Sequence, residues 1–379
     1  MNTLKFSPAK KSRVFAFVIQ ITLCSLFAEQ GPQFRDLQSQ SMGRTGVASS
    51  QGVSALFLNP AGLGNNHQIG GGLIADLGVN SVLLDYAKWA GENYKYLNNS
   101  DSLLTKIGPV DNRWAPFSQS LMLYGNVQGI AVAALSDTRY DLTIGKAVVT
   151  PVPGVGVLSD FVLTAGRGFQ AEDGYQFGFA LKYIYRLRFD DRLVGTSEDP
   201  FYQVLNAWRS PDNGILDKIR KLKIAGDLAE TSQGIGLNLG GQKTINENWC
   251  AGISLLDFPT IMSSKFIRPD INLGVAYRQN LDLVPDLQNK LLVNLDFQHF
   301  LIPGTPWFKQ IKTGVALEGY MNKRPVSYVS VGLNDGYPTF GARVGYIVYL
   351  SYTYIAEEIG TYPGQEKLSF HKVALQLDI

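Results

Sequence analysis

The sequence predicts a transmembrane antiparallel β-barrel of about 14 strands, plugged by an N-terminal hatch, and three observations support this all-β fold class. The N-terminus carries an export signal, most of the chain alternates apolar and polar residues with a period of two, and alternate connections are short. The composition agrees, because 45% of the residues are apolar and only 17% are charged, against roughly 25% charged in a typical soluble domain.

Residues 1–28 have the pattern of a secretory signal peptide. A basic head precedes a short apolar run over 14–23, and a small residue, Ala28, stands at the expected cleavage point. The run is shorter than the roughly 20 apolar residues that a spanning helix needs. The alternative is a lipid on Cys24, but the bulky Leu23 stands where a lipoprotein signal has a small residue. With no later candidate for a spanning helix, the chain is either a soluble exported protein or an outer-membrane barrel.

The segment 175–190 shows the alternation most clearly. Its odd positions form an aromatic and aliphatic stripe, whereas its even positions, apart from Ile184, are polar, small or charged. Successive side chains of a strand point to opposite faces. A stripe of this length exceeds the five or six residues of an average strand and is typical of a transmembrane strand with a lipid face and a lumen face. The alternative is a large soluble β-sandwich whose stripes face a core.

Fourteen segments read as strands, and single-chain bacterial barrels have even numbers of strands. Short polar turns, such as 126–128 and 170–173, alternate with longer loops, such as 89–117; the turn at 280–289 is a longer exception. Short periplasmic turns and long external loops place both termini in the periplasm. The predicted strands are 68–88, 118–126, 129–147, 157–168, 174–190, 231–242, 248–257, 269–279, 290–301, 310–320, 326–334, 338–345, 347–356 and 367–378.

The longest loop, 191–230, contains a predicted helix. Asp212 can cap it, and Ile215, Leu216, Ile219 and Leu222 follow at helical spacing. This helix either packs on the rim of the barrel or contacts lipid headgroups or a ligand.

Residues 29–67, between the signal peptide and the first strand, lack the alternation. Small residues dominate 41–50 and 54–64, and Gly and Ala allow close packing in a confined space. Asn59-Pro60 is a turn signal. We therefore predict three parts of the chain: a signal peptide over 1–28, a compact plug inside the lumen over 29–67, and the barrel over 68–379.

Two motifs and the spacing between them, Gly43-Arg44-Thr45-Gly46-Val47-Ala48 and Asn59-Pro60-Ala61-Gly62-Leu63, resemble the FadL-type outer-membrane transporters of hydrophobic compounds. The resemblance implies a 14-stranded barrel with a hatch that obstructs the lumen. The segment 356–364 is more similar to distant branches of that family, which include components associated with protein secretion. The alternative is that Asn-Pro-Ala is only a structural turn. The implied hatch residues are Gly43, Arg44, Gly46, Asn59, Pro60 and Ala61.

The resemblance implies a transporter in the cell outer membrane for passive uptake of hydrophobic compounds such as long-chain fatty acids, with the ligand released past the hatch. The alternatives are an accessory barrel that docks secreted proteins, or a structural or adhesive surface barrel. We expect a hydrophobic small molecule or lipid as ligand, outer-membrane lipids as surroundings, and a monomer.

Other function classes receive little support from the composition. The net charge of +2 gives no signal for nucleic acid, which favours strongly basic domains. Three His and two Cys argue against a zinc site, and we expect neither a metal nor another cofactor. His67, His299 and His371 are far apart, and no nucleophile motif accompanies them, so we expect no enzymatic activity.

Four cations are candidate ligands for a carboxylate on the cargo. Lys182, Arg186 and Arg188 lie on the inward face of one predicted strand, and Arg278 lies on that of another. Arginine can hold a carboxylate with two parallel hydrogen bonds. The alternative is that these cations pair with acidic residues of the lumen; the candidates are Asp296, Glu318 and Asp190.

A polar stretch interrupts the predicted third strand. Its outward positions are apolar through Ala134, and four polar residues follow, Ser136, Asp137, Thr138 and Arg139. Arg or Lys on the lipid face near mid-bilayer costs about 2–4 kcal/mol, so this stretch predicts a kink or bulge. In the family that the chain resembles, a kink in the third strand opens a gap through which cargo leaves sideways, which makes these residues a candidate lateral gate. The alternative is an ordinary turn at 136–141.

Overall fold

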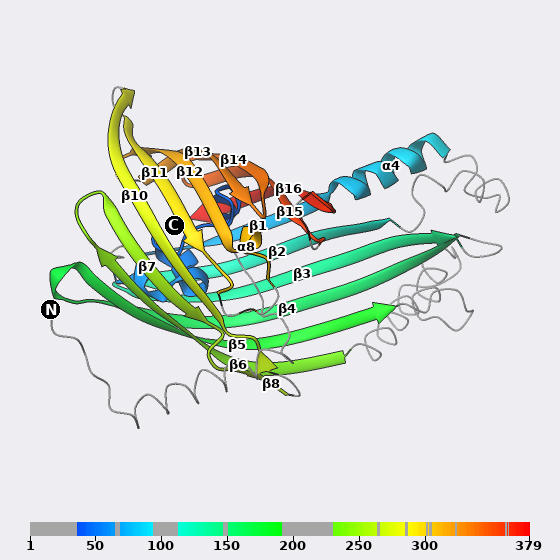
Figure 1. Ribbon diagram of the computed structural model, residues 1–379, viewed down its shortest axis with the longest axis horizontal. Helices are drawn as coiled ribbons and strands as arrows, with labels where there is room; N and C mark the ends of the chain where they lie inside the picture. Colours follow the sequence, from blue (N-terminus) through cyan, green and yellow to red (C-terminus); the bar gives the residue numbers. More distant parts are fainter. Residues whose placement is uncertain are drawn as a thin grey trace.

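The computed structural model describes residues 36–64, 69–93, 113–146, 151–191, 230–263, 266–284, 287–300, 302, 305–322, 324–360, 362 and 364–379. The predicted signal peptide and the predicted loop helix lie outside these ranges. Fourteen antiparallel strands form a closed ring (Figure 1). The ring strands are β1 Gly70–Asn80, β2 Trp114–Val127, β3 Ile130–Lys146, β4 Pro151–Gln170, β5 Tyr175–Asp191, β6 Glu230–Thr244, β7 Trp249–Leu256, β10 Asp270–Val284, β11 Leu287–Phe297, β12 Ile311–Met321, β13 Arg324–Asn334, β14 Tyr337–Gly345, β15 Val348–Glu358 and β16 Lys367–Asp378.

The ring closes between β1 and β16, which pair over nine positions from Gly72 to Asn80. Consecutive ring strands pair with each other, so the topology is a simple up-and-down barrel. Two short strands, β8 Thr260–Met262 and β9 Phe266–Ile267, lie in the predicted loop 258–268. There the chain turns at Asp257, which has a positive φ of 57°, and β8 then continues beside β6. The predicted 14-stranded barrel is therefore confirmed.

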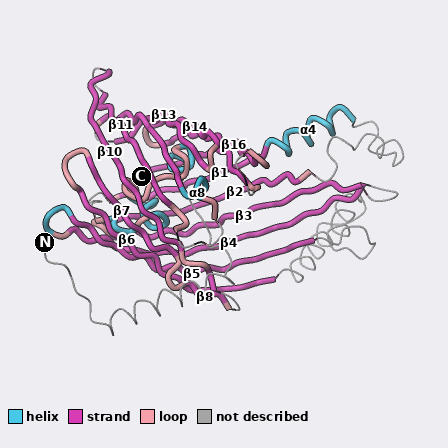
Figure 2. Tube along the Cα trace, in the orientation of Figure 1, coloured by secondary structure: helices cyan, strands magenta, loops and turns pink. Residues whose placement is uncertain are grey.

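Alternate connections reach the same end of the barrel, where Gly71 and Ile379 also exchange backbone hydrogen bonds. Figure 2 shows these connections as short turns between strands. One of them, between β4 and β5, holds the short 3₁₀ helix η5, Glu172–Gly174. The turn predicted to be longer, 280–289, is in fact short, because β10 runs on to Val284 and β11 begins at Leu287.

The first predicted strand, 68–88, is wrong in its second half. β1 ends at Asn80, and a helix, α4 Ser81–Asn93, follows. The Asn80 side chain accepts a hydrogen bond from the backbone N–H of Val82 at 2.7 Å, as a helix-capping residue does. Tyr86, Trp89 and Val82 then fall at helical spacing and pack near Ala115 of β2, so tertiary contact favours the helix.

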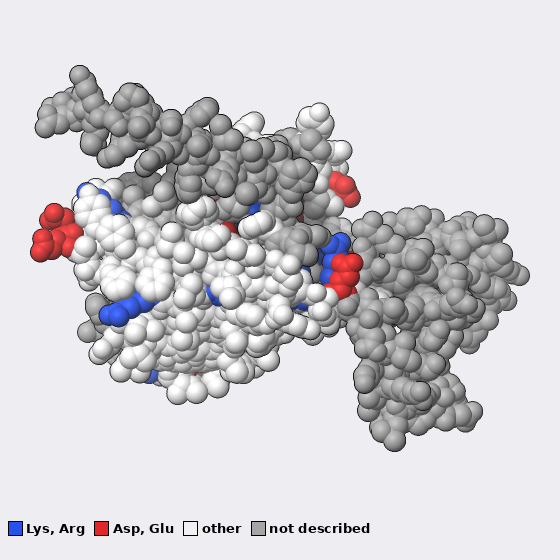
Figure 3. All heavy atoms as spheres, turned by 90° about the horizontal axis from the view of Figure 1, so that it is seen from below, with Lys and Arg blue, Asp and Glu red and all other residues white. Residues whose placement is uncertain are grey.

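The outer surface of the ring is apolar. Along β5 the six odd positions from Tyr175 to Tyr185 are 37–53% exposed, whereas the alternating Gln176, Lys182 and Arg186 are at most 7% exposed. Figure 3 shows one face as a broad, mostly uncharged surface whose clearest charged patches lie toward its two ends. An apolar exterior around a polar interior is the pattern of a transmembrane barrel. None of the helices in the described ranges is long and apolar enough to span a membrane.

Two parts of the ring differ in height. We call β2–β5 the long wall, because its strands have 14, 17, 20 and 17 residues, and β11–β16 the short wall, because its strands have 9–12 residues. Figure 1 shows the long wall extending well beyond the short wall at the end away from the short turns. A four-residue helix, α8 Trp307–Gln310, precedes β12 at the top of the short wall.

The hatch, residues 36–64 of the described chain, fills the lumen of this barrel. It consists of four short helical segments: α2 Leu37–Ser41, η1 Gly52–Ser54, α3 Ala55–Leu58 and η2 Pro60–Leu63. Most of its side chains are buried, and Ala55, Leu56, Ala61 and Leu63 are fully so. The plugged barrel that the sequence predicts is therefore present.

Candidate functional site

The hatch rests on a cradle of wall glycines. A Cβ added to Gly178 would lie 2.2 Å from the Pro60 carbonyl oxygen, and one added to Gly240 would lie 2.0 Å from Asn59 Oδ1. Only glycine lets the two backbones come this close. The barrel interior is therefore shaped to the hatch around most of its circumference. The glycine cradle comprises Gly166, Gly168, Gly178, Gly240, Gly252, Gly274, Gly314, Gly332 and Gly341.

The first hatch motif is bonded to the short wall. Gly43 and Gly46 have φ of 72° and 149°, a region that glycine enters without steric cost. The backbone N–H of Gly46 donates to Asp296 Oδ2 at 2.7 Å, and that of Val47 donates to the same oxygen at 3.1 Å. Arg44 forms an ion pair of 2.8 Å with Glu357.

Further hydrogen bonds hold the same part of the hatch to the short wall. They are Thr339 Oγ1 to the Ser41 carbonyl at 2.7 Å, the Gly43 N–H to Thr339 Oγ1 at 3.0 Å, Gln298 Nε2 to the Arg44 carbonyl at 2.8 Å, Thr353 Oγ1 to the Leu37 carbonyl at 3.2 Å, and the contacts Ser41–Ser330 and Gln38–Glu318. Together with Asp296 and Glu357, they come from β11, β12, β13, β14 and β15, and Gln298 directly follows β11.

The second motif, Asn59-Pro60-Ala61, links the parts of the hatch. Asn59 Oδ1 accepts from the Ala61 N–H at 3.2 Å and caps η2, while its Nδ2 donates to the Val47 carbonyl at 2.7 Å and to the Gly241 carbonyl at 3.2 Å. Asn59 is therefore both a turn residue and a tie between the first motif and β6. The structure brings all six predicted hatch residues into the plug; their role in transport and the exact domain boundaries stay predictions.

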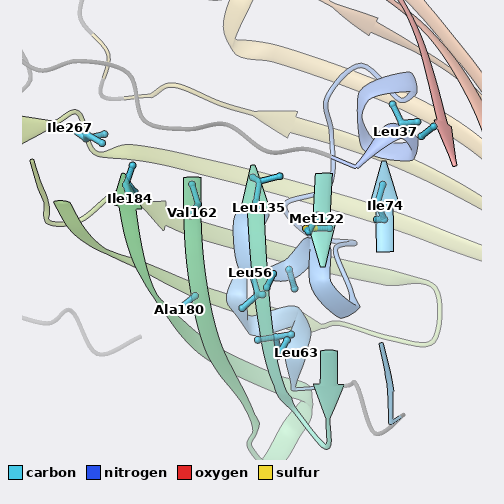
Figure 4. Packing of buried hydrophobic residues seen from close by; sticks show 14 of the residues in the cluster. Leu37, Leu56, Leu63, Ile74, Met122, Leu135, Val162, Ala180, Ile184 and Ile267 are labelled. Atoms are coloured by element: carbon cyan, nitrogen blue, oxygen red, sulfur yellow. The ribbon is translucent and has the colours of Figure 1, made fainter. Parts of the chain in front are cut away.

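An apolar row crosses the inner face of the long wall. Cross-strand pairing aligns Ile74 with Met122, Met122 with Leu135, Leu135 with Val162, and Val162 with Ile184. Beyond Ile184 the row continues through Gly234 to Met262. Figure 4 shows the row from Ile74 to Ile184 in one line, with Leu56 and Leu63 of the hatch beside it. We call Ile74, Met122, Leu135, Val162, Ile184 and Met262 the lumen row; each is at most 8% exposed.

Sequence reasoning missed the lumen row, although a signal for it exists. Three of its members are the middle residue of an apolar triplet: Leu121-Met122-Leu123, Phe161-Val162-Leu163 and Tyr183-Ile184-Tyr185. In a barrel strand the two outer residues of such a triplet face lipid, so the middle one faces the lumen. Ile184 was the single exception noted in its stripe, and the structure shows that it belongs to a row shared by neighbouring strands.

A second row lies on the same inward face, two residues further along each strand from the short turns. Pairing aligns Asp76, Ser120, Asp137, Asp160 and Arg186 on β1 to β5, and we call these five residues the acidic tier. Arg186 holds Asp160 with two hydrogen bonds, Nε to Oδ1 at 2.7 Å and Nη2 to Oδ2 at 2.8 Å. Ser120 donates to Asp76. Carboxylates thus lie beside the lumen row on the same inward face, on the side away from the short turns.

The four predicted carboxylate ligands do not form one site. Lys182 pairs with Asp257 at 2.5 Å, with both side chains buried, and Arg186 pairs with Asp160. Arg278 donates to the Ser49 carbonyl of the hatch at 2.9 Å, while Arg188, which is exposed, lies opposite Glu230.

The alternative of pairing with acidic residues of the lumen holds for Lys182 and Arg186, but with partners other than those expected. Asp296 accepts hydrogen bonds from the hatch backbone. Glu318 accepts from Gln38 and from Tyr320. The side chain of Asp190 lies outside the described residues.

The expected kink at 136–139 and the alternative turn at 136–141 are both absent. β3 pairs with β2 and with β4 in continuous register from Ile130 through Thr143. Alternation explains why no kink is needed: Asp137 and Arg139 share the inward face with Leu135, whereas Ser136 and Thr138 face outward. The Thr138 hydroxyl bonds the Ser159 hydroxyl of β4 at 2.8 Å. A gate at Ser136, Asp137, Thr138 and Arg139 stays a prediction, without the kink that suggested it.

These features define the class of protein, a transmembrane β-barrel whose lumen is closed by its own N-terminal segment. Within the described ranges no group of three His, Cys, Asp or Glu side chains could hold a metal ion, and the one cysteine there, Cys250, is a free thiol. No family model matches the sequence, and no curated protein matches it either.

Solved structures share the fold over nearly the whole chain. A mutant of the TodX monoaromatic hydrocarbon channel has a TM-score of 0.50 at 11% identity, covering 91% of this chain and 98% of that one. The toluene transporter TodX of Pseudomonas putida scores 0.48 at 13% identity, covering 93% and 98%. The toluene transporter TbuX of Ralstonia pickettii scores 0.48 at 11% identity, covering 91% and 98%. The fold that the FadL-type resemblance implies is therefore confirmed.

Proposed function

We propose that the protein is an outer-membrane channel for passive uptake of hydrophobic compounds. The observation that carries this proposal is the lumen row, because barrel lumens are ordinarily polar. Six apolar side chains aligned across β1 to β5 and on to β8 give a hydrophobic molecule a surface inside an otherwise polar interior. A water-filled pore has a polar lumen, so an aligned row of apolar side chains is not expected there.

The contacts that hold the hatch support a route for the hydrophobic ligand between the hatch and the long wall. On the short wall the hatch is held by directional bonds, such as those from Gly46 and Val47 to Asp296. On the long wall Leu56 and Leu63 pack in the same apolar cluster as Leu135 and Val162. A hydrophobic ligand can replace apolar contacts with its own at little cost, whereas breaking a buried hydrogen bond costs about 1–3 kcal/mol.

The named channels with the same fold support the same class of cargo. The solved barrel with the TM-score of 0.50 is described as a monoaromatic hydrocarbon channel. We extend to this chain only the general property, passage of a hydrophobic small molecule through a plugged barrel in the outer membrane. Export by cleavage of residues 1–28 and a monomeric state are parts of this proposal.

Native mass spectrometry of the detergent-extracted protein, combined with an uptake assay in proteoliposomes, tests the proposal. The wild-type barrel should carry a co-purified hydrophobic molecule and should pass a neutral fluorescent hydrophobe. Val162→Thr puts a hydroxyl of similar size into the lumen row and should slow uptake several-fold. Val132→Thr makes the same change on the lipid face of β3, where Val132 is 50% exposed, and should leave uptake unchanged.

Two results would contradict the proposal. One is a barrel that neither carries nor passes any hydrophobe while the same preparation is folded. The other is reproducible co-purification of an exported protein in place of a small molecule, which would favour the docking alternative.

A further inference from the structure

We propose, on the basis of the proposed function, that the cargo is a hydrophobic molecule bearing a hydrogen-bond donor, such as an alcohol, a phenol or an amine, and that fatty-acid anions are disfavoured. The argument rests on the acidic tier, which lies directly beside the lumen row. A molecule whose apolar part lies on Leu135 and Val162 places its polar end next to Asp137 and Asp160, their strand neighbours two residues along the inward face.

The charge of this tier is negative. Three of its five members are aspartates and one is an arginine, and the nearest cation at its end is Lys372, whose Nζ lies 4.0 Å from Asp76 Oδ1. Three acidic and two basic side chains leave one formal negative charge beside the lumen row. Because like charges repel, a carboxylate head is disfavoured here, and more strongly in a protein interior than in water.

Two carboxylates of the tier have capacity to accept hydrogen bonds. The Asp76 side chain is only 6% exposed, and its buried Oδ1 atom accepts no hydrogen bond from the described residues. Asp137 faces the lumen between Ser120 and Asp160, and no donor in the described part of the chain bonds its carboxylate. An ionised carboxylate only accepts hydrogen bonds, so the polar group of a ligand that bonds Asp76 or Asp137 has to be a hydrogen-bond donor.

The cations beside the lumen row are already engaged. Arg186 donates through Nε and Nη2 to the two carboxylate oxygens of Asp160, and Lys182 is paired with Asp257. Arg139, one row further out, bonds Asp141 at 3.1 Å and lies over the Trp114 ring at 4.7 Å. Diverting Arg186 or Lys182 to a carboxylate ligand would leave the buried Asp160 or Asp257 without its cation, which is strongly unfavourable.

Three decyl compounds that differ only in the head group test the inference: decanol, decylamine and decanoate. Each competes at neutral pH with a bound neutral fluorescent hydrophobe on the purified full-length barrel in nanodiscs. Decanol and decylamine should displace the probe at concentrations about tenfold or more below that needed for decanoate, a ratio typical of one unit charge a few ångströms away in a protein environment.

Variants locate the effect. In Asp137→Asn and in Asp76→Asn the preference for decylamine over decanoate should fall by about tenfold, the change expected when one acidic charge becomes neutral. Asp173→Asn changes an exposed turn between β4 and β5 and should leave the preference at its wild-type value.

The outcomes separate the two proposals. Equal or better displacement by decanoate overturns this inference while the proposed function stands. Failure of the fluorescent hydrophobe and of all three compounds to bind overturns the proposed function itself. An unchanged preference in both Asp137→Asn and Asp76→Asn removes the acidic tier as its origin.

Discussion

The long wall and the short wall hold the same hatch by different chemistry. The short wall presents polar side chains, among them Asp296 and Thr339, which bond the hatch backbone at 2.7–3.1 Å. The long wall presents the lumen row and glycines such as Gly168 and Gly178. Hydrogen bonds fix orientation and are costly to break, whereas apolar packing is non-directional and exchangeable. The difference indicates that the short wall anchors the hatch; under the proposed function, we expect the ligand to pass on the side of the long wall.

The largest effect should come from filling the cradle on the long wall. Gly178→Val would place side-chain atoms on the Pro60 backbone, which cannot move without displacing η2, and the cost should be about 3 kcal/mol or more. We expect the hatch to leave its seat and the barrel to conduct ions in planar bilayers.

Gly156→Val is the matched control for this substitution. Gly156 lies on the same wall, and a Cβ there would meet its nearest neighbour, the Cβ of Asp141, at an ordinary 3.5 Å. If the Gly178→Val barrel does not conduct ions and its hatch is unchanged, the glycine cradle does not determine how the hatch is seated in the lumen.

A somewhat smaller effect is expected from a cavity in the lumen row. Leu135 is fully buried, and Leu135→Ala should lower the free energy of unfolding by about 2–5 kcal/mol. Urea unfolding in lipid vesicles measures the loss. Leu163→Ala removes the same atoms from a lipid-facing position that is 44% exposed and should cost clearly less. Equal losses at the two positions would mean that the inner face of the long wall contributes no more packing than its outer face.

The anchor on the short wall should be weakened moderately by removing the charge of Asp296. Asp296→Asn keeps the shape and an acceptor oxygen but turns two charge-assisted bonds into ordinary ones, a loss of about 1–2 kcal/mol. Because these bonds orient the segment at Gly46 and Val47, the hatch should become more sensitive to limited proteolysis. If the sensitivity rises more in Leu135→Ala than in Asp296→Asn, the roles of the two walls are reversed.

The smallest effect should come from the ion pair between Arg44 and Glu357. Its side chains are 28% and 17% exposed, so solvent screens the pair, and its contribution should be less than about 1 kcal/mol. A double-mutant cycle with Arg44→Gln and Glu357→Gln measures the coupling, which should shrink further as salt is added. A coupling that is large and independent of salt would place this pair among the main anchors.

The strands were predictable because they carry a local signal. The period of two over 175–190 marks both faces of β5, and the apolar positions of the final strand, such as Val373 and Leu375, are exposed as the alternation requires. The second half of the segment 68–88 was misassigned because Asn80 caps a helix whose apolar residues also fit a strand. The polar stretch at 136–139 needed no kink, because alternation divides it between the two faces.

The seat of the hatch could not be predicted, because its contacts join distant parts of the chain. Asp296 meets the N–H of Gly46 across 250 residues, and no local pattern links the two. The glycines of the cradle have ordinary neighbours in sequence, and only strand register brings Gly178 opposite Gly168 and Gly240. The lumen row likewise exists only once β1–β5 and β8 are aligned, although Ile184 stands out in the sequence as an exception to the alternation.

The close fit of the cradle also constrains how the molecule is assembled. The hatch precedes β1, and β1 pairs with β16, which holds the last residues of the barrel sheet. A segment that packs as closely against wall backbones as Pro60 does against Gly178 fits most easily when the wall forms around it. We therefore expect the sheet to curl around the hatch and the β1–β16 seam to join with the lumen already occupied, so that the hatch acts as a template for closure of the cylinder.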